Sequence, residues 1–157
     1  MILISSSASI RKAFHIVPVS TVPTVPANDW YRHWRVDARK NHELGEIMLF
    51  TNYETLYTIT ADSRNFRRTN DMLIYFLFRY VELFGAHFKG QREIKENIII
   101  HKEVNLSVTG VMNGMFQRIN SLSCNYGHSE IENLVNQAPI GSSGITPLEN
   151  LTEKLSK

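Results

Sequence analysis

The stretch EIMLFTNYETLYTIT, residues 46–60, decides the first part of the fold because it contains two runs that are typical of β-strands. Residues 46–51 and 55–60 are rich in Ile, Leu, Phe, Tyr and Thr, the residue types that fit a pleated, half-buried surface. Between them, Asn52, Tyr53 and Glu54 make a short polar connection of the kind that joins antiparallel strands. The stretch therefore predicts a β-hairpin.

Residues 30–39, which precede this hairpin, alternate between two kinds of side chain. One set is mainly apolar (Trp30, Trp34, Val36 and Ala38) and the other mainly polar (Tyr31, His33, Arg35, Asp37 and Arg39). A period of two predicts a strand with one face in the core and the other in water. Residues 1–4 and 98–100 predict further short strands, and residues 8–14 one or two helical turns.

Two longer segments predict helices. Residues 69–84 are apolar on nearly every side, so we expect this helix to be central, with Tyr75, Arg79 and Glu82 as its single polar edge. Residues 107–122 carry one apolar stripe at helical spacing, which predicts a helix packed on the sheet. Phe76, Phe78, Val111, Met115 and Ile119 are expected to share one core.

Capping patterns predict two short helices near the C-terminus. The first should begin at Ser129 with Glu132 in the capping box, and the second at Thr146 with Pro147 and Glu149. The expected fold is one α+β domain over residues 1–157, in which an antiparallel sheet packs against two main helices. Its strands are the segments that start near Trp30, Glu46, Thr55 and Ile98. Residues 17–27 form a proline-rich connector, and residues 139–145 a flexible loop.

Composition limits the classes of function. Seventeen Lys and Arg against fifteen Asp and Glu give a net charge of +2, so any contact with nucleic acid must depend on a local basic patch. The single cysteine, Cys124, excludes an internal disulfide and favours a cytoplasmic location. No apolar run approaches the ~20 residues of a membrane span, and the six histidines are too scattered to predict a metal site. No cofactor is expected.

The sequence contains no motif that by itself indicates a catalytic mechanism, such as a phosphate-binding glycine loop. This absence makes an enzyme less expected but does not exclude one. The first hypothesis is a small binding or regulatory domain that acts on a protein or nucleic-acid partner. The alternative is a toxin-like ribonuclease that uses His33 and Arg35 on the polar strand face as a base and a phosphate-binding group. The favoured interpretation of that face is a solvated surface with ion pairs.

Three arginines surround Phe66 just before the apolar helix: Arg64, Arg67 and Arg68. Arginines near a helix N-terminus oppose the helix dipole, which favours an external anion or an acidic partner over a role in helix stability. A plain solvated loop nevertheless remains the leading interpretation of these arginines.

Gly110 and Gly114 flank Asn113 on the helix predicted for residues 107–122. Each glycine costs up to ~1 kcal/mol of helix stability relative to alanine, and close backbone packing would explain both. Asn113 lies at the edge of the apolar stripe. We expect its amide to bond the backbone of a neighbouring strand or turn, with direct contact to a ligand as the alternative.

The order of these elements, the hairpin IMLFTNYETLYTI (residues 47–59) and the segment SVTGVMNGM (residues 107–115) resemble the bacterial family called domain of unknown function 6933. The sequence departs from the family pattern at Leu106, where an arginine is common, and at Gly114, where an acidic residue is usual. The resemblance implies a related fold, a cytoplasmic bacterial origin and an important role for Asn113. It implies no mechanism, because the family has no assigned activity.

Overall fold

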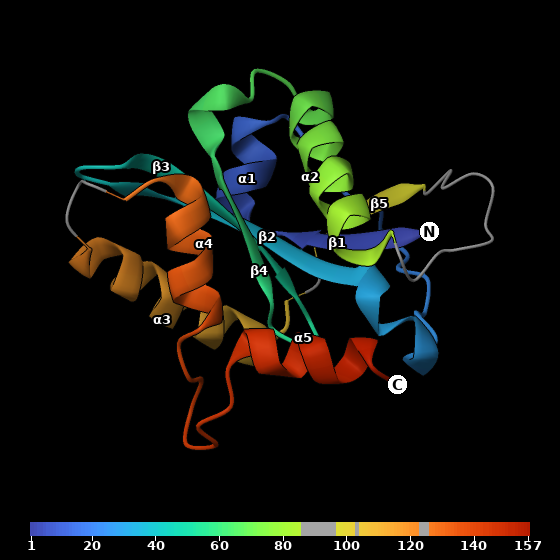
Figure 1. The fold of residues 1–157 in the computed structure, drawn as a ribbon. Helices are drawn as coiled ribbons and strands as arrows, with labels where there is room; N and C mark the ends of the chain where they lie inside the picture. Colours follow the sequence, from blue (N-terminus) through green and yellow to red (C-terminus); the bar gives the residue numbers. More distant parts are fainter. Residues whose placement is uncertain (86–96, 103, 123–125) are drawn as a thin grey trace.

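The chain folds into a central β-sheet with helices on both faces, as seen in a computed structural model that describes residues 1–85, 97–102, 104–122 and 126–157 (Figure 1). The strands are β1 (Ile2–Ser6), β2 (His33–Asn41), β3 (Gly45–Asn52), β4 (Thr58–Asp62) and β5 (Ile98–His101). The α-helices of the described residues are α1 (Ala8–Ala13), α2 (Thr69–Phe84), α3 (Leu106–Ser121), α4 (His128–Asn136) and α5 (Pro147–Leu155). Short 3₁₀ helices span Ala27–Arg32 and Ser63–Asn65.

The sheet is mixed, which corrects the expected antiparallel arrangement. Its strand order is β4-β3-β2-β1-β5, and β1 lies parallel to both β2 and β5. Only β2, β3 and β4 form an antiparallel unit. The first strand of the chain thus becomes an inner strand, buried along its whole length. Such burial on both faces is typical of parallel strands that are covered by helices.

Two cores replace the single expected one. On one face of the sheet, α1 and α2 pack on a cluster that includes Trp34, Phe50 and Phe76. On the other face, α3 and α4 pack on a cluster that includes Leu49, Met115 and Ile119. The sheet lies between Phe76 of α2 and the pair Met115 and Ile119 of α3, because these helices pack on opposite faces of the sheet. The expectation that these residues share one core is wrong.

Several predicted boundaries shift in the structure. β2 begins at His33, since residues 30–32 belong to a 3₁₀ helix. In the predicted hairpin the second strand starts at Thr58 rather than Thr55, because Asn52 accepts backbone hydrogen bonds from residues 54 and 55 and holds a turn there. The N-cap of α4 is Gly127, whose backbone N–H donates to the Glu130 carboxylate, and not Ser129 as expected. The expected caps of α5 are confirmed: Thr146 at the N-cap and Pro147 in the first turn.

The outer edge of β4 is covered by side chains instead of a further strand. Asn136 of α4 accepts from Thr58 N (2.8 Å) and donates to Thr58 O (2.7 Å). Glu132, one turn earlier, accepts from Thr60 N (2.9 Å), and the Tyr75 hydroxyl donates to Thr60 O (2.7 Å). All four outward backbone groups of Thr58 and Thr60 are therefore occupied, as buried backbone groups require.

Candidate functional site

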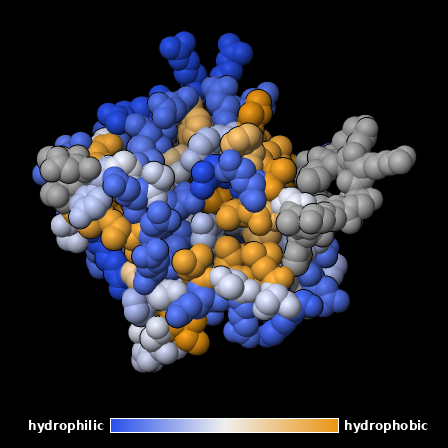
Figure 2. Space-filling view, viewed as in Figure 1, coloured by the Kyte–Doolittle hydropathy of each residue, from blue (hydrophilic) through white to orange (hydrophobic). Residues whose placement is uncertain are grey.

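The outward side of α2 carries an apolar stripe that faces solvent. Ile74, Phe78 and Val81, at spacing i, i+4 and i+7, are 66%, 63% and 40% exposed. Figure 2 shows hydrophobic surface gathered over α2 on this side of the molecule. We call these three residues the α2 outer face. The expectation of a fully central helix is wrong, and so is the placement of Phe78 in the core.

Two of the three residues of the polar edge expected for α2, Tyr75 and Arg79, make contacts inside the molecule, whereas Glu82 is exposed. Arg79 Nη2 lies 2.7 Å from Oε1 of buried Glu132, while its Nη1 lies 3.3 Å from Glu82 on the surface. The Tyr75 hydroxyl reaches the β4 backbone, and burial raises the pKa of this tyrosine. Tyr75 and Arg79 are thus used for internal contacts with β4 and α4, while Ile74, Phe78 and Val81 face solvent.

The three arginines near Phe66 do not act as one cluster. Arg64 is held within the chain, since its guanidinium binds both carboxylate oxygens of Asp62 and the carbonyl oxygen of Leu44. This contact lowers the pKa of Asp62, chiefly through the hydrogen bond from Arg64. Arg67 and Arg68 are exposed at the N-terminal end of α2, and their backbone N–H groups bind Asp71. Within the described part of the chain, no ion pair involves either guanidinium.

A second feature is a row of polar residues that crosses all five strands on the α3 side of the sheet. The strand registers place its members side by side: Thr58, Thr51, Arg35, Ser5 and His101. We call this set the polar row. Every member is buried, so the expectation of a solvated face on β2 fails at Arg35, although Arg39 on the same face is exposed. At the β4 end of the polar row, the hydroxyl groups of Thr51 and Thr58 form a hydrogen bond of 2.9 Å with each other.

Arg35 is the charged member of the polar row. It is only 5% exposed, and its Nε and Nη1 atoms are buried without a hydrogen-bond partner among the described residues. A guanidinium stays protonated in proteins and presents five donors, so it cannot avoid this situation by losing its charge. Buried charges are otherwise paired in native structures. Arg35 is therefore the side chain whose environment most needs an explanation.

Two imidazoles and a phenol lie on the same side of the sheet as Arg35. His33, two residues earlier on the same face of β2, stacks on Tyr53 with ring centroids 3.7 Å apart. The His33 and His101 rings are 5.6 Å apart, and the Tyr53 hydroxyl shares a 2.7 Å hydrogen bond with Ser5. A cavity of about 410 Å³ opens beside His33; its lining consists of Leu3, Val22, Pro23, Thr24, Val25 and His33. The sequence predicted His33 and Arg35, and the structure adds Ser5, Tyr53 and His101.

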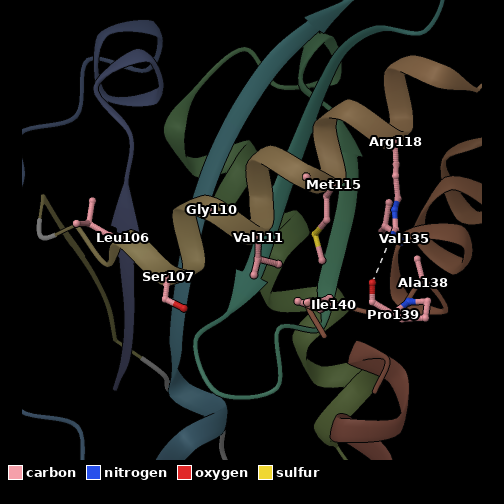
Figure 3. A pocket seen from close by; sticks show the side chains of 12 residues that line it. Leu106, Ser107, Gly110, Val111, Met115, Arg118, Val135, Ala138, Pro139 and Ile140 are labelled. Atoms are coloured by element: carbon pink, nitrogen blue, oxygen red, sulfur yellow. Dashed lines mark hydrogen bonds between the residues drawn. The ribbon is translucent and has the colours of Figure 1, made fainter. Parts of the chain in front are cut away.

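A groove of about 410 Å³ separates α3 from the loop that follows α4 (Figure 3). Gly110 and Gly114 line it, and a Cβ atom added to either would meet no atom within 4 Å. The expectation that close backbone packing explains these glycines is therefore wrong. Arg118 bridges one end of the groove by donating to the carbonyl oxygen of Pro139, the dashed line of Figure 3.

Asn113 binds a side chain rather than the backbone contact that was expected. Its Oδ1 accepts a hydrogen bond from Arg39 Nη2. The Arg39 guanidinium also lies over the Phe116 ring, 4.7 Å from its centroid. Arg39 and Asn113 together thus fasten α3 to β2. This structural role separates Asn113 from His33 and Arg35.

Comparison of the chain with protein-family models, curated proteins and solved structures gave no match. Across residues 1–85, 97–102, 104–122 and 126–157, no group of three His, Cys, Asp or Glu side chains is arranged to hold a metal ion. No described helix is long and apolar enough to cross a membrane. Cys124 lies outside the described residues.

Proposed function

We propose that the protein is a small binding module and that an acidic, amphipathic helix of a partner protein docks on the α2 outer face. The observation that carries this proposal is the exposure of Ile74, Phe78 and Val81 in one line along the helix. Apolar anchors at this spacing match the contacts between an amphipathic helix and the surface that receives it. A partner would bury apolar area that is now in contact with water.

Charge supports an acidic partner. Arg67 and Arg68 are exposed just before α2, the helix that carries the apolar stripe, and their side chains form no ion pair among the described residues. Carboxylates on a docked helix would complement these guanidinium groups and speed association. They would also relieve the unfavourable position of two cations near a helix N-terminus.

The test compares three variants in affinity capture from the native host, followed by measured binding of the captured partner. Phe78→Asp should weaken binding at least ~10-fold, the effect typical of losing an interfacial anchor. Arg67→Ser combined with Arg68→Ser should weaken binding and reduce its dependence on salt. Leu106→Ser is the matched control, because Leu106 is equally apolar and exposed but lies at the start of α3. Equal binding by the parent and Phe78→Asp would exclude this surface.

Ribonuclease activity is a second candidate function, favoured by the position of His101 beside His33, on the side of the sheet that also carries Arg35. Two imidazoles near a guanidinium provide the groups for general acid–base catalysis and for stabilising a phosphorane-like charge. The parent protein and a His33→Gln variant should be incubated with single-stranded RNA. Cleavage by the parent alone supports this function, whereas intact RNA in both samples argues against it.

A further inference from the structure

The groove between α3 and the loop that follows α4 is mainly apolar. Val111 and Met115 of α3 line one side of it, while Val135 of α4 and Ile140 of the following loop line the other (Figure 3). Its volume of about 410 Å³ falls within the range of small-molecule sites, which are typically apolar with a few polar groups. An apolar ligand would be favoured here because it removes this surface from water.

Gly110 and Gly114, one helical turn apart on α3, leave room in this groove. A Cβ atom added to either would meet no atom within 4 Å, so packing among the described residues does not require glycine at these positions. Glycine also lowers the stability of a helix relative to alanine. Because both glycines belong to the lining, a side chain at either position would take up space that a ligand could fill.

Arg118 is the one charged residue in the described lining of the groove. Its Nη2 donates to the carbonyl oxygen of Pro139 at 3.1 Å, which places the guanidinium at one end of the groove (Figure 3). The side chain is exposed, and no ion pair involves it within the part of the chain that the structure describes. Since a guanidinium has five N–H donors, most of them stay available to an anion.

We propose that this groove binds a medium-chain aliphatic monocarboxylate, with its carboxylate on Arg118 and its chain along Gly114 and Gly110. A guanidinium binds a carboxylate through charge-assisted hydrogen bonds, which would fix the direction of the ligand. Arg118 follows Gly110 by eight residues, about 12 Å along the helix axis, and the glycines let a narrow chain approach the backbone. The site does not depend on the α2 outer face, because α2 and α3 pack on opposite faces of the sheet.

The first experiment compares three probes by titration calorimetry and by the shift of the thermal midpoint, at concentrations below those that form micelles. Decanoate should bind most tightly. Butyrate should bind more than about 10-fold more weakly, because it buries fewer methylene groups. Decyltrimethylammonium has a chain of the same length but a positive charge, so it should also bind more than about 10-fold more weakly. No binding of decanoate would overturn the proposal, and equal affinity for decanoate and decyltrimethylammonium would overturn the assignment of a carboxylate.

Substitutions at Gly114 test whether the chain of the ligand lies in the groove. Gly114→Leu fills this space and should abolish binding of decanoate without lowering the thermal midpoint of the ligand-free protein. Gly114→Ala adds only a methyl group, so it should remain folded and bind decanoate more weakly. Gln117→Leu is the matched control, because Gln117 is exposed on the same helix outside the lining; its affinity should stay within about 2-fold of the parent. Unchanged affinity in both Gly114 variants would overturn the proposal.

Charge reversal at Arg118 distinguishes contact with the carboxylate from a purely structural role. Arg118→Glu should weaken binding of decanoate by about 10-fold or more and strengthen binding of decyltrimethylammonium, which reverses the preference of the site. If Arg118 only fastened the loop through Pro139, both affinities would change in the same direction, and that result would overturn its role in binding. Lys12→Gln is the control for net charge, since Lys12 is exposed on α1 at the opposite face of the sheet. It should leave both affinities unchanged.

Discussion

Replacing Glu132 with Gln tests whether one buried carboxylate joins α2, α4 and the edge of β4. The carboxylate accepts from Arg79 Nη2 at 2.7 Å, from Thr60 N at 2.9 Å and from the Tyr57 hydroxyl at 3.4 Å. A glutamine has nearly the same shape but keeps only one oxygen and turns an NH₂ group toward one of these donors. At least one donor then loses its acceptor.

The expected cost follows from these contacts. A donor left unsatisfied in a buried site costs about 1–3 kcal/mol. Removing one partner of a fully buried ion pair costs about 3–5 kcal/mol, but the Arg79 side chain is 30% exposed, so water compensates part of that loss. We therefore expect Glu132→Gln to lower the free energy of unfolding by about 2–4 kcal/mol.

Glu82→Gln provides the matched control, because Glu82 pairs with the same arginine at 3.3 Å from a half-exposed position. Its cost should stay below about 1 kcal/mol. Urea unfolding followed by tryptophan fluorescence measures both variants, since Trp34 is buried against the aromatic residues of α2. Equal costs for the two substitutions would refute the central role of Glu132.

Three further predictions concern α3 and Tyr57. Gly110→Ala and Gly114→Ala should each raise the free energy of unfolding by up to about 1 kcal/mol in urea titrations, because an added methyl group meets no neighbour; a loss would refute the open groove. Phe116→Ala or Ile119→Ala should cost about 2–5 kcal/mol, and an unchanged thermal midpoint would contradict their packing in the α3 core. Burial raises the pKa of Tyr57 from 10.0 to about 12, so the folded state keeps a proton that the unfolded state releases. Stability should therefore fall between about pH 10 and 12, and Tyr57→Phe should lack that part of the loss; parallel pH profiles would contradict this assignment.

The local elements were predictable because their signals lie within short windows. The helices at residues 69–84 and 107–122 are confirmed as α2 (Thr69–Phe84) and α3 (Leu106–Ser121). Strand pairing is different, since nothing in residues 1–4 specifies that they pair with β2 and β5 in parallel. The orientation of α2 was also hidden, because a helix that is apolar all round does not show which side faces solvent.

The candidate site was predictable only in part, for a similar reason. The alternation of β2 placed His33 and Arg35 on one face, but their partners come from strands far away in sequence. Ser5 and His101 each follow three apolar residues, in the segments ILIS (residues 2–5) and IIIH (residues 98–101). A polar residue directly after such a run is a weak signal of a buried polar contact. Their alignment with Arg35 depends on register, which residue types alone do not specify.

The two edges of the sheet are largely closed to pairing with another chain. Exposed backbone along an edge strand is a template for strand addition and for fibril growth. Here Glu132, Asn136 and Tyr75 occupy the outward groups of β4, and at the other edge Val19 N donates to Ile100 O of β5. A strand of another chain that paired with either edge would first have to displace these contacts. If the protein binds a partner as proposed, side chains rather than backbone pairing would determine which partner is accepted.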